Sequence, residues 1–455
     1  MERNYTRGSV FGGILSFCLP YLLSYFLQTL YGMADLFIIG QFGQVADTTA
    51  VSIGSQVMHM LTVMLVGLAM GATVTIGQAV GGEKRERAAL SIGNTVTLFM
   101  ALSVVLTAVL LLATDRIVAA MSTPAAAAAG ARSYLTVCFL GIPFITAYNV
   151  ISSIFRGLGD SKSPMYFVAV ACGTNIVLDY LFMGALGLGP AGAALGTTLS
   201  QTVSVGVSLA AILRRRGGLS VGRGDFRPRG EMMGQILRVG IPVALQDGFI
   251  QISFIVITVI ANRRSLQAAA AVGIVEKIMS FMFLAPSAML STVSALGAQN
   301  IGAGKPERAV QILKYAVMMV SALTLTVSVG MQFIAEPLVA LFTDSAAADG
   351  AAVILLGGQY LRGYVWDCFF GGIQFSFSGY FCARGRSELS FLHNLLSILL
   401  VRVPGAYLAA RFFPDTLFPM GLASTFGSVL SVLVCAAVFL LLRRGDRSAE
   451  RGAAA

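Results

Sequence analysis

Long apolar runs alternate with short polar breaks along all 455 residues of the chain. A helix needs about 20 apolar residues to cross the hydrocarbon core of a bilayer. Runs of this length predict an all-α membrane protein with twelve transmembrane helices. The predicted spans are residues 11–39, 52–80, 91–113, 133–156, 164–185, 190–213, 235–261, 269–299, 309–333, 352–381, 388–410 and 416–442.

Composition agrees with this pattern. The chain is 56% hydrophobic and 11% charged, whereas soluble domains have about 45–50% apolar and about 25% charged residues. The six cysteines and two histidines are scattered singly through apolar runs, at no metal-ligand spacing and in no nucleophile–base arrangement. No GxxxxGK[ST] sequence for phosphate binding occurs. We therefore expect no enzyme, no cofactor and no ATP-driven transport.

Basic residues indicate the orientation of the chain in the membrane. Lys and Arg concentrate in alternate loops, and by the positive-inside rule these loops and both termini are cytoplasmic. This pattern also explains the net charge of +10 better than nucleic-acid binding does. The basic positions are Lys84, Arg85, Arg87, Arg156, Lys162, Arg214 to Arg216, Arg223, Arg227, Arg229, Lys305, Arg308, Arg384, Arg386 and the C-terminal arginines.

An internal repeat divides the chain into two halves. GQAVGGEKRERA (77–88) matches AQNIGAGKPERA (298–309), and Pro20 with Pro242 and Gly159 with Gly385 keep the same register. Six spans per half give both halves the same orientation, with a cavity expected between them near the bilayer midplane. We predict an N-terminal lobe (1–213), a basic cytoplasmic linker (214–231), a C-terminal lobe (232–445) and a cytoplasmic tail (446–455).

Ionisable side chains at membrane depth are costly and usually functional. Asp35 lies late in the first predicted span, with Gln28 and Tyr31, two candidates for the substrate cavity, on related helical faces. Asp179 lies in the fifth span, and Asn175 precedes it by one helical turn on the same face. The orientation of the spans places the two carboxylates at similar depth. We therefore predict a shared site that contains both acids.

The second half lacks this acid pair. The positions equivalent to Asp35 and Asp179 are approximately Ile257 and Gly405. A purely structural requirement would be expected in both halves. A carboxylate in a low dielectric can bind and release a proton, and clustered oxygen atoms can instead bind a monovalent cation such as Na⁺. The residues alone leave both coupling ions open.

Second-half candidates for the substrate cavity are fewer. Asp247 and Gln251 lie one turn apart on the seventh span, and Trp366 and Asp367 are adjacent on the tenth. Either acid can also be explained structurally, Asp247 as an interfacial residue and Asp367 as a partner of a nearby arginine. Arg402 is a candidate to neutralise an acid of its own half.

These features together resemble the multidrug and toxic compound extrusion (MATE) family, within the multidrug/oligosaccharidyl-lipid/polysaccharide exporter superfamily, over essentially the whole chain. The resemblance implies a V-shaped, twelve-helix antiporter with a cation site in its first half. By motif, that site comprises Asp35, Asn149, Asn175, Asp179 and Thr197. The motifs are Pro20 and Pro242, YGMADLFIIG around Asp35, the 77–88 repeat, FRGLGDSKSP (155–164), NIVLD (175–179) and PAGAALGTTLSQ (190–201).

The function expected from the residues and the resemblance is efflux of small amphiphilic or cationic organic compounds in exchange for H⁺ or Na⁺. The expected partners are the organic substrate and the lipid bilayer, without nucleic acid. We expect a monomer in the plasma membrane. One alternative is a lipid-linked saccharide flippase of the same superfamily, whose cavity would be rich in arginine. Another is a membrane-embedded enzyme, for which the sequence offers no convergent nucleophile or metal ligands.

Overall fold

The computed structural model describes residues 4–214, 221–343 and 349–454. Within these ranges the chain forms helices and connecting turns, without a β-strand. Residues 215–220 of the predicted linker and residue 455 of the predicted tail lie outside them. The helices are α1 (Val10–Phe42), α2 (Val45–Gly81), α3 (Arg85–Ala120), α4 (Ala125–Leu140), α5 (Ile142–Gly157), α6 (Lys162–Asp179), α7 (Gly189–Arg214), α8 (Gly230–Asn262), α9 (Leu266–Met282), α10 (Leu284–Gly302), α11 (Pro306–Ala340), α12 (Gly350–Tyr364), α13 (Trp366–Ala383), α14 (Ser387–Ser397), α15 (Val403–Phe412) and α16 (Phe418–Ala454).

Two π-helical segments and one short 3₁₀ helix complete the helical structure. The π-helical segments are η1 (Tyr180–Ala185), which follows α6, and η3 (Ile398–Arg402), which joins α14 to α15. The 3₁₀ helix η2 (Arg223–Phe226) lies in the linker. A π-helical turn inside a helix is uncommon and often marks a functional position. Each π-helical segment has an ionisable residue at its edge, Asp179 before η1 and Arg402 at the end of η3.

Ten of the twelve predicted spans lie within one helix or two consecutive helical segments; span 388–410 covers α14, η3 and α15, and span 416–442 begins two residues before α16. Among the described residues, ten segments are long and apolar enough to cross a membrane, and α4 with α5 makes an eleventh that is bent by 50°. The remaining predicted span, 352–381, is formed by α12 and α13. The fold is therefore that of a multi-pass α-helical membrane protein.

Local sequence explains where several helices begin and break. Ser9 caps α1 by accepting a hydrogen bond from the backbone N–H of Gly12 at 3.2 Å. The bend between α4 and α5 lies at Gly141, just before Pro143, which has no N–H to continue the hydrogen-bond ladder. A Cβ at Gly141 would lie 2.7 Å from Oγ1 of Thr198 on α7, so glycine allows this close approach.

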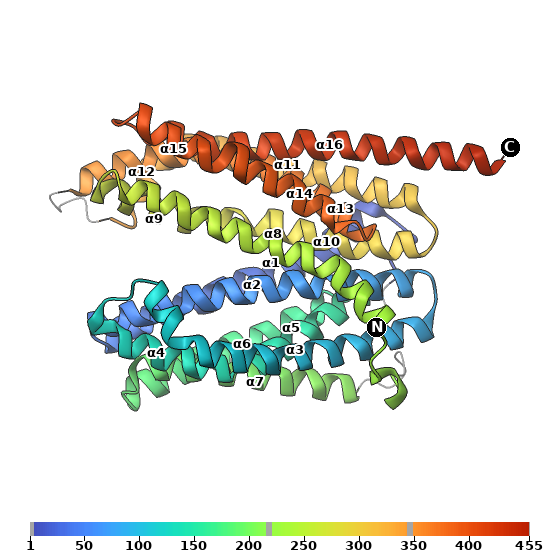
Figure 1. Cartoon of the computed structure of the whole chain (residues 1–455), viewed down its shortest axis with the longest axis horizontal. Coiled ribbons are helices and arrows are strands. Elements are labelled where there is room, and N and C mark those ends of the chain that lie inside the picture. The colour runs from blue at the N-terminus through green and yellow to red at the C-terminus, as the bar shows by residue number, and fades with distance from the viewer. Residues whose placement is uncertain (1–3, 215–220, 344–348, 455) are drawn as a thin grey trace. The chain divides into compact units, whose positions relative to one another are not determined.

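The helices group into two compact units. The first comprises residues 1–244 and 294–309. In it α2 packs against α3, α4 and α5, while α6 packs against α1 and α7; Figure 1 shows α2 running alongside α3, and α6 alongside α7. Its largest apolar core surrounds Tyr134, Leu135 and Phe139 of α4, with contributions from α1, α2 and α7. This arrangement brings the polar residues of α1, α6 and α7 together.

The second unit comprises residues 245–293 and 310–455. The long C-terminal helix α16 packs against α12, α13 and α15, and α12 also packs against α9. The core contains the fully buried Tyr360 and Tyr364 of α12 together with Leu417 and Met420 of the α16 region. Residues 230–244 and 294–309, which belong to the second half in chain order, are thus part of the first unit.

The repeat predicted from the sequence has the same backbone conformation in both copies. Lys84 N–H donates to the Ala79 carbonyl at 2.9 Å, and Lys305 N–H donates to the Asn300 carbonyl at 2.9 Å. The residue before each lysine has a positive φ, 56° at Glu83 and 70° at Gly304. The two sequence copies therefore form the same helix–turn–helix connection, from α2 to α3 and from α10 to α11.

The two copies of the repeat also pack against each other within the first unit. A Cβ added to Gly81 would collide with the backbone carbonyl of Gln299, and one added to Gly302 would collide with the carbonyl of Gln78. The two collisions are reciprocal, as expected for pseudo-symmetry. Glycine at both positions allows backbone to lie directly on backbone.

Residues in or just after each copy of the repeat also bind the segment that precedes the first helix of the other half. Lys305 donates to the Thr6 carbonyl at 3.0 Å, and Arg308 donates to the Gly8 carbonyl at 2.8 Å, just before α1. In the first half, Asn94 of α3, six residues after the 77–88 copy, accepts from the Arg229 N–H at 2.7 Å and donates to the Asp225 carbonyl at 3.1 Å, just before α8. These contacts anchor the first helix of each half.

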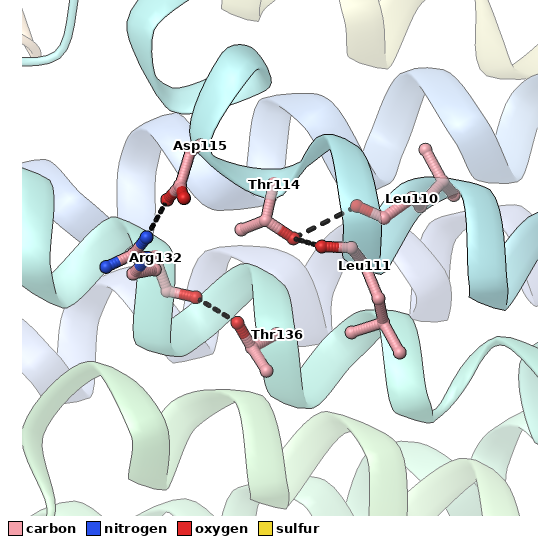
Figure 2. A network of polar contacts seen from close by, with 6 residues as sticks. All are labelled: Leu110, Leu111, Thr114, Asp115, Arg132 and Thr136. Carbon is pink, nitrogen blue, oxygen red and sulfur yellow. Dashed lines mark hydrogen bonds and ion pairs between the residues drawn. The ribbon is translucent and has the colours of Figure 1, made fainter.

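A solvent-exposed ion pair stabilises the connection between α3 and α4. Asp115 and Arg132 form this pair, with side chains 67% and 59% exposed (Figure 2). Beside it, Thr114 Oγ1 donates to the carbonyls of Leu110 and Leu111, and Thr136 Oγ1 donates to the Arg132 carbonyl. These hydroxyls are thereby satisfied within their own helices.

Candidate cation site

Three helices of the first unit position a cluster of buried polar side chains. Asp35 projects from α1, Asn175 and Asp179 from the last turn of α6, and Thr197 from α7. Asn175 and Asp179 share a face because they are four residues apart in a helix. Asp35 is 3% exposed, and Asn175 and Asp179 are fully buried. Four of the five residues implied by the family resemblance thus meet at one point.

The contacts within this cluster place the two carboxylates against each other. Thr197 Oγ1 donates a hydrogen bond to Asp35 Oδ2 at 3.0 Å. Asp179 and the Asn175 amide are both immediate neighbours of the Asp35 carboxylate. Gly196, next to Thr197, leaves the space that the Asp179 carboxylate occupies, and a Cβ there would collide with Asp179 Oδ1.

Several polar atoms of the cluster are buried without a hydrogen-bond partner. Buried carboxylate and amide atoms are normally satisfied, because an unpaired one costs free energy. Two carboxylates in contact also repel each other unless a proton or a cation lies between them. The unsatisfied atoms are Asp35 Oδ1, Asp179 Oδ1 and Oδ2, and Asn175 Oδ1 and Nδ2. The cluster is therefore suited to binding a small cation.

The donor atoms of the cluster are oxygens from carboxylate, amide and hydroxyl groups. Such donors suit hard cations such as Na⁺, or a shared proton, rather than a transition metal. No group of three or more His, Cys, Asp or Glu side chains that could hold a metal ion occurs in the part of the chain that the structure describes.

Asn149 occupies a different position from these four residues. Its Nδ2 donates to the Ile145 carbonyl of its own helix at 2.8 Å. Its side chain lines a small cavity of about 10 Å³ together with Gln28. Asn149, which the family resemblance implies for the cation site, and Gln28, predicted for the substrate cavity, are thus neighbours in one cavity.

Tyr31 lies between the carboxylate cluster and the small cavity lined by Asn149 and Gln28. It lies one turn before Asp35 on α1, and Asp35, Tyr148 and Gln201 are among its neighbours. Gln201 is 5% exposed, and its Oε1 has no hydrogen-bond partner. Sequence reasoning missed Gln201, although it lies four residues after Thr197 and hence on the same face of α7.

Asp367, at the start of α13, is fully buried and forms an ion pair with Arg402. The prediction that Arg402 neutralises an acid of its own half is thereby confirmed. The nearer arginine in the sequence, Arg362, instead pairs with Glu336 at 2.8 Å. Trp366 packs against the apolar core of this unit. Asp367 is therefore a neutralised carboxylate, unlike Asp35 and Asp179.

Asp247 and Gln251, the other second-half candidates, are half-buried on α8. Asp247 lies near Cys382, at the end of α13 opposite to Asp367. Positions 367 and 382 are fifteen residues apart, which corresponds to about 22 Å of helix axis, at about 1.5 Å per residue. The two second-half acids therefore do not meet at one point.

Comparison with known proteins agrees with this architecture. The MatE family model matches residues 20–181 and 242–408, one match in each half of the chain. The chain is 27% identical over 443 residues to "Probable multidrug resistance protein YpnP" of Bacillus subtilis, covering 97% of each chain. It is 26% identical to "Probable multidrug resistance protein NorM" of Thermotoga maritima, covering 88% of this chain and 86% of that one.

A similar fold occurs among solved structures. The structure titled "Outward-facing conformation of a multidrug resistance MATE family transporter of the MOP superfamily" superposes with a TM-score of 0.88 at 24% identity. The match covers 97% of this chain and 98% of that one. Together with the family match over both halves, this shows that the chain is a membrane transporter of the MatE family.

Proposed function

We propose that this transporter is a secondary active antiporter that exports small amphiphilic or cationic organic compounds in exchange for H⁺ or Na⁺ by alternating access. The observation that carries the proposal is the pair of buried carboxylates, Asp35 and Asp179, with unsatisfied oxygen atoms. Relatives that the chain covers almost completely are named as multidrug resistance and multidrug export proteins, which supports an exported organic substrate.

In the proposed mechanism, the cluster binds the coupling ion, and the bound ion changes the relative stability of the two access states. A cation between Asp35 and Asp179 removes their repulsion and satisfies the Asn175 amide oxygen. Loss of the cation restores the repulsion and the unsatisfied atoms. A ligand shifts a conformational equilibrium only through such a difference in binding free energy.

The test uses purified full-length protein in liposomes loaded with ethidium, an organic cation. An imposed Na⁺ or pH gradient should drive ethidium across the membrane. Asp35→Asn and Asp179→Asn should each reduce this gradient-driven movement at least about tenfold, the effect of about 1.4 kcal/mol. The matched control is Asp115→Asn, which changes an exposed carboxylate. Full gradient-driven activity in both site variants would disprove the mechanism.

The coupling ion is a separate question with its own measurement. Na⁺ and pH gradients are imposed one at a time on the same liposome preparation. Movement with the pH gradient alone assigns H⁺, and movement with the Na⁺ gradient at equal pH assigns Na⁺. Either result is compatible with a site made of carboxylate, amide and hydroxyl oxygens.

The alternative function, a lipid-linked saccharide flippase, is not favoured. Its expected signature is a cavity with several arginines, whereas Arg156 is the one arginine among the residues that line the small cavity of the first unit. We expect no enzymatic activity. The proposed setting is the plasma membrane, with both termini cytoplasmic and the protein monomeric.

A further inference from the structure

Arg156 is a buried arginine without an anionic partner. The sequence suggested a loop position for it, but the structure places it in the last turn of α5, 5% exposed. No ion pair involves Arg156 in the described part of the chain, and its buried Nε has no hydrogen-bond partner. Buried arginines are ordinarily paired, because an isolated charge in a low dielectric carries a large desolvation penalty.

The second half of the chain does not repeat this arginine. The segments 155–160 and 381–386 are equivalent: Asp160 N–H donates to the Phe155 carbonyl at 2.8 Å, and Arg386 N–H donates to the Phe381 carbonyl at 2.9 Å. In this register the residue equivalent to Arg156 is Cys382. The connection therefore forms without an arginine, and its fold does not require the charge.

The surroundings of Arg156 are polar and neutral. It lines the cavity of about 10 Å³ with Gln28, Asn149, Tyr148 and Ser24, and its guanidinium lies 5.2 Å from the centre of the Tyr21 ring. The lining residues from α1, α2, α5 and α6 include no carboxylate. These amide and hydroxyl groups can donate hydrogen bonds to an anion but cannot neutralise the guanidinium.

We propose that the small cavity lined by Arg156 is a subsite for an oxyanion group. The group is a carboxylate, sulfonate or phosphate, and it pairs with the Arg156 guanidinium. The guanidinium can donate a charge-assisted hydrogen bond to an oxygen of such a group. A cavity of this size holds about one water-sized group, so an anionic oxygen can enter it while the rest of the ligand extends away. Water alone would satisfy hydrogen bonds without supplying the missing charge.

This inference refines the proposed function and depends on it for its transport meaning. A substrate with both a cationic and an anionic group would place the anionic group at Arg156. The subsite lies apart from the two carboxylates of the cation site, and a binding measurement tests it without any ion gradient.

The test compares two probes that share a pyrenyl butyl body. One is 1-pyrenebutyrate, and the other is the matching pyrenylbutyl trimethylammonium. Binding to full-length protein in phosphatidylcholine nanodiscs is measured by fluorescence anisotropy, with empty nanodiscs subtracted. Arg156→Gln removes the charge, Arg156→Lys keeps it without the planar fork, and Arg132→Gln is the exposed control.

We expect Arg156→Gln to weaken pyrenebutyrate binding about tenfold or more, as for loss of a charge-assisted hydrogen bond. Arg156→Lys should give an intermediate loss, and Arg132→Gln none. Binding of the ammonium probe should be unchanged or tighter in Arg156→Gln. Equal pyrenebutyrate binding in wild type, Arg156→Gln and Arg156→Lys, or an equal loss for both probes, would overturn the inference. If Arg156→Gln does not fold, the comparison of Arg156→Lys with wild type decides.

Two competition arms identify the source of the anion. Displacement of pyrenebutyrate by inorganic phosphate indicates a site for free oxyanions, whereas displacement only by phosphatidic acid in the nanodisc indicates a lipid headgroup; both support the subsite. Loss of gradient-driven ethidium movement together with Arg156-dependent binding would refute the antiporter and leave the subsite. Intact ethidium movement without Arg156-dependent binding would refute the subsite and leave the antiporter.

Discussion

The guanidinium of Arg402, at the end of a π-helical segment, pairs with the carboxylate of Asp367 in the interior of the second unit. The Arg402 guanidinium also lies 5.6 Å from the centre of the Phe254 ring. In the first unit the helix equivalent to α14–α15 is α6, which contributes Asn175 and Asp179 instead of an arginine. The second unit therefore has an internal cation beside its buried acid, whereas Asp35 and Asp179 lie close together without one.

Breaking this pair should destabilise the protein strongly. Arg402→Gln leaves Asp367 as an unpaired buried charge, and such changes cost about 3–5 kcal/mol. The double variant Arg402→Gln/Asp367→Asn should recover much of this loss. Urea unfolding in detergent, followed by circular dichroism, measures it. For comparison, Arg132→Gln breaks the exposed pair with Asp115 (Figure 2) and should cost only about 0–1 kcal/mol. A similar loss of unfolding free energy in Arg402→Gln and Arg132→Gln would contradict the buried Arg402–Asp367 ion pair.

Gly196 should be required for the geometry of the cation site. In Gly196→Ala the new methyl group meets Asp179 Oδ1, so the carboxylate must leave its present position beside Asp35. We expect gradient-driven transport to fall about tenfold or more, with a stability cost of about 1–3 kcal/mol from overpacking. The control is Gly206→Ala on the same helix, where a Cβ meets nothing within 4 Å. Liposome transport and thermal unfolding of both variants test this prediction.

The contact between the two repeat copies should not tolerate a side chain. Gly81→Ala and Gly302→Ala each place a methyl group against a backbone carbonyl, which cannot rotate away as a side chain can. Each variant should lose about 1–3 kcal/mol of unfolding free energy. Gly234→Ala, at an open position of α8, should be neutral or slightly stabilising. A neutral result for both repeat variants would show that the two connections do not pack as described.

The segments before α1 and α8 should be held by their hydrogen bonds to residues in or just after the two repeat copies. Arg308→Gln should increase amide hydrogen exchange in residues 4–9, because the carbonyls of Tyr5 and Gly8 lose a donor. Asn94→Ala should increase exchange in residues 221–229 and cost about 0.5–1.5 kcal/mol, since it removes hydrogen bonds to the Arg229 N–H and the Asp225 carbonyl. Mass spectrometry resolves the two segments. Each variant should leave the other segment unchanged, and simultaneous release of both would indicate global destabilisation instead.

Local sequence was sufficient to predict the membrane-spanning segments and the repeat, but not the breaks that divide several spans into two helices. A span of about 20 apolar residues has one stable structure in a bilayer, a helix that satisfies its own backbone. The same locality explains why Asn175 and Asp179 were correctly placed on one face. This locality also explains why the match between residues 77–88 and 298–309 predicts two helix–turn–helix connections with the same backbone conformation.

Contacts between helices were less accessible to sequence reasoning. Asp367 was weighed as a partner of Arg362, five residues away, but it pairs with Arg402, thirty-five residues away. Arg156 was counted among loop charges because it lies at the end of a predicted span. Burial at a helix end depends on how far neighbouring helices extend, which no pattern within one helix records.

For this protein the sequence by itself determined the twelve spans, the two equivalent halves and the presence of Asp35 and Asp179 in the first half. The tertiary structure alone decided that these two carboxylates meet, that Thr197 donates to one of them, and that Asp367 is neutralised. The physical reason is that hydrophobic periodicity fixes where a helix forms. The rotation and depth of each helix, and hence which polar groups meet, follow from side-chain packing across α1, α6 and α7 and within the second unit.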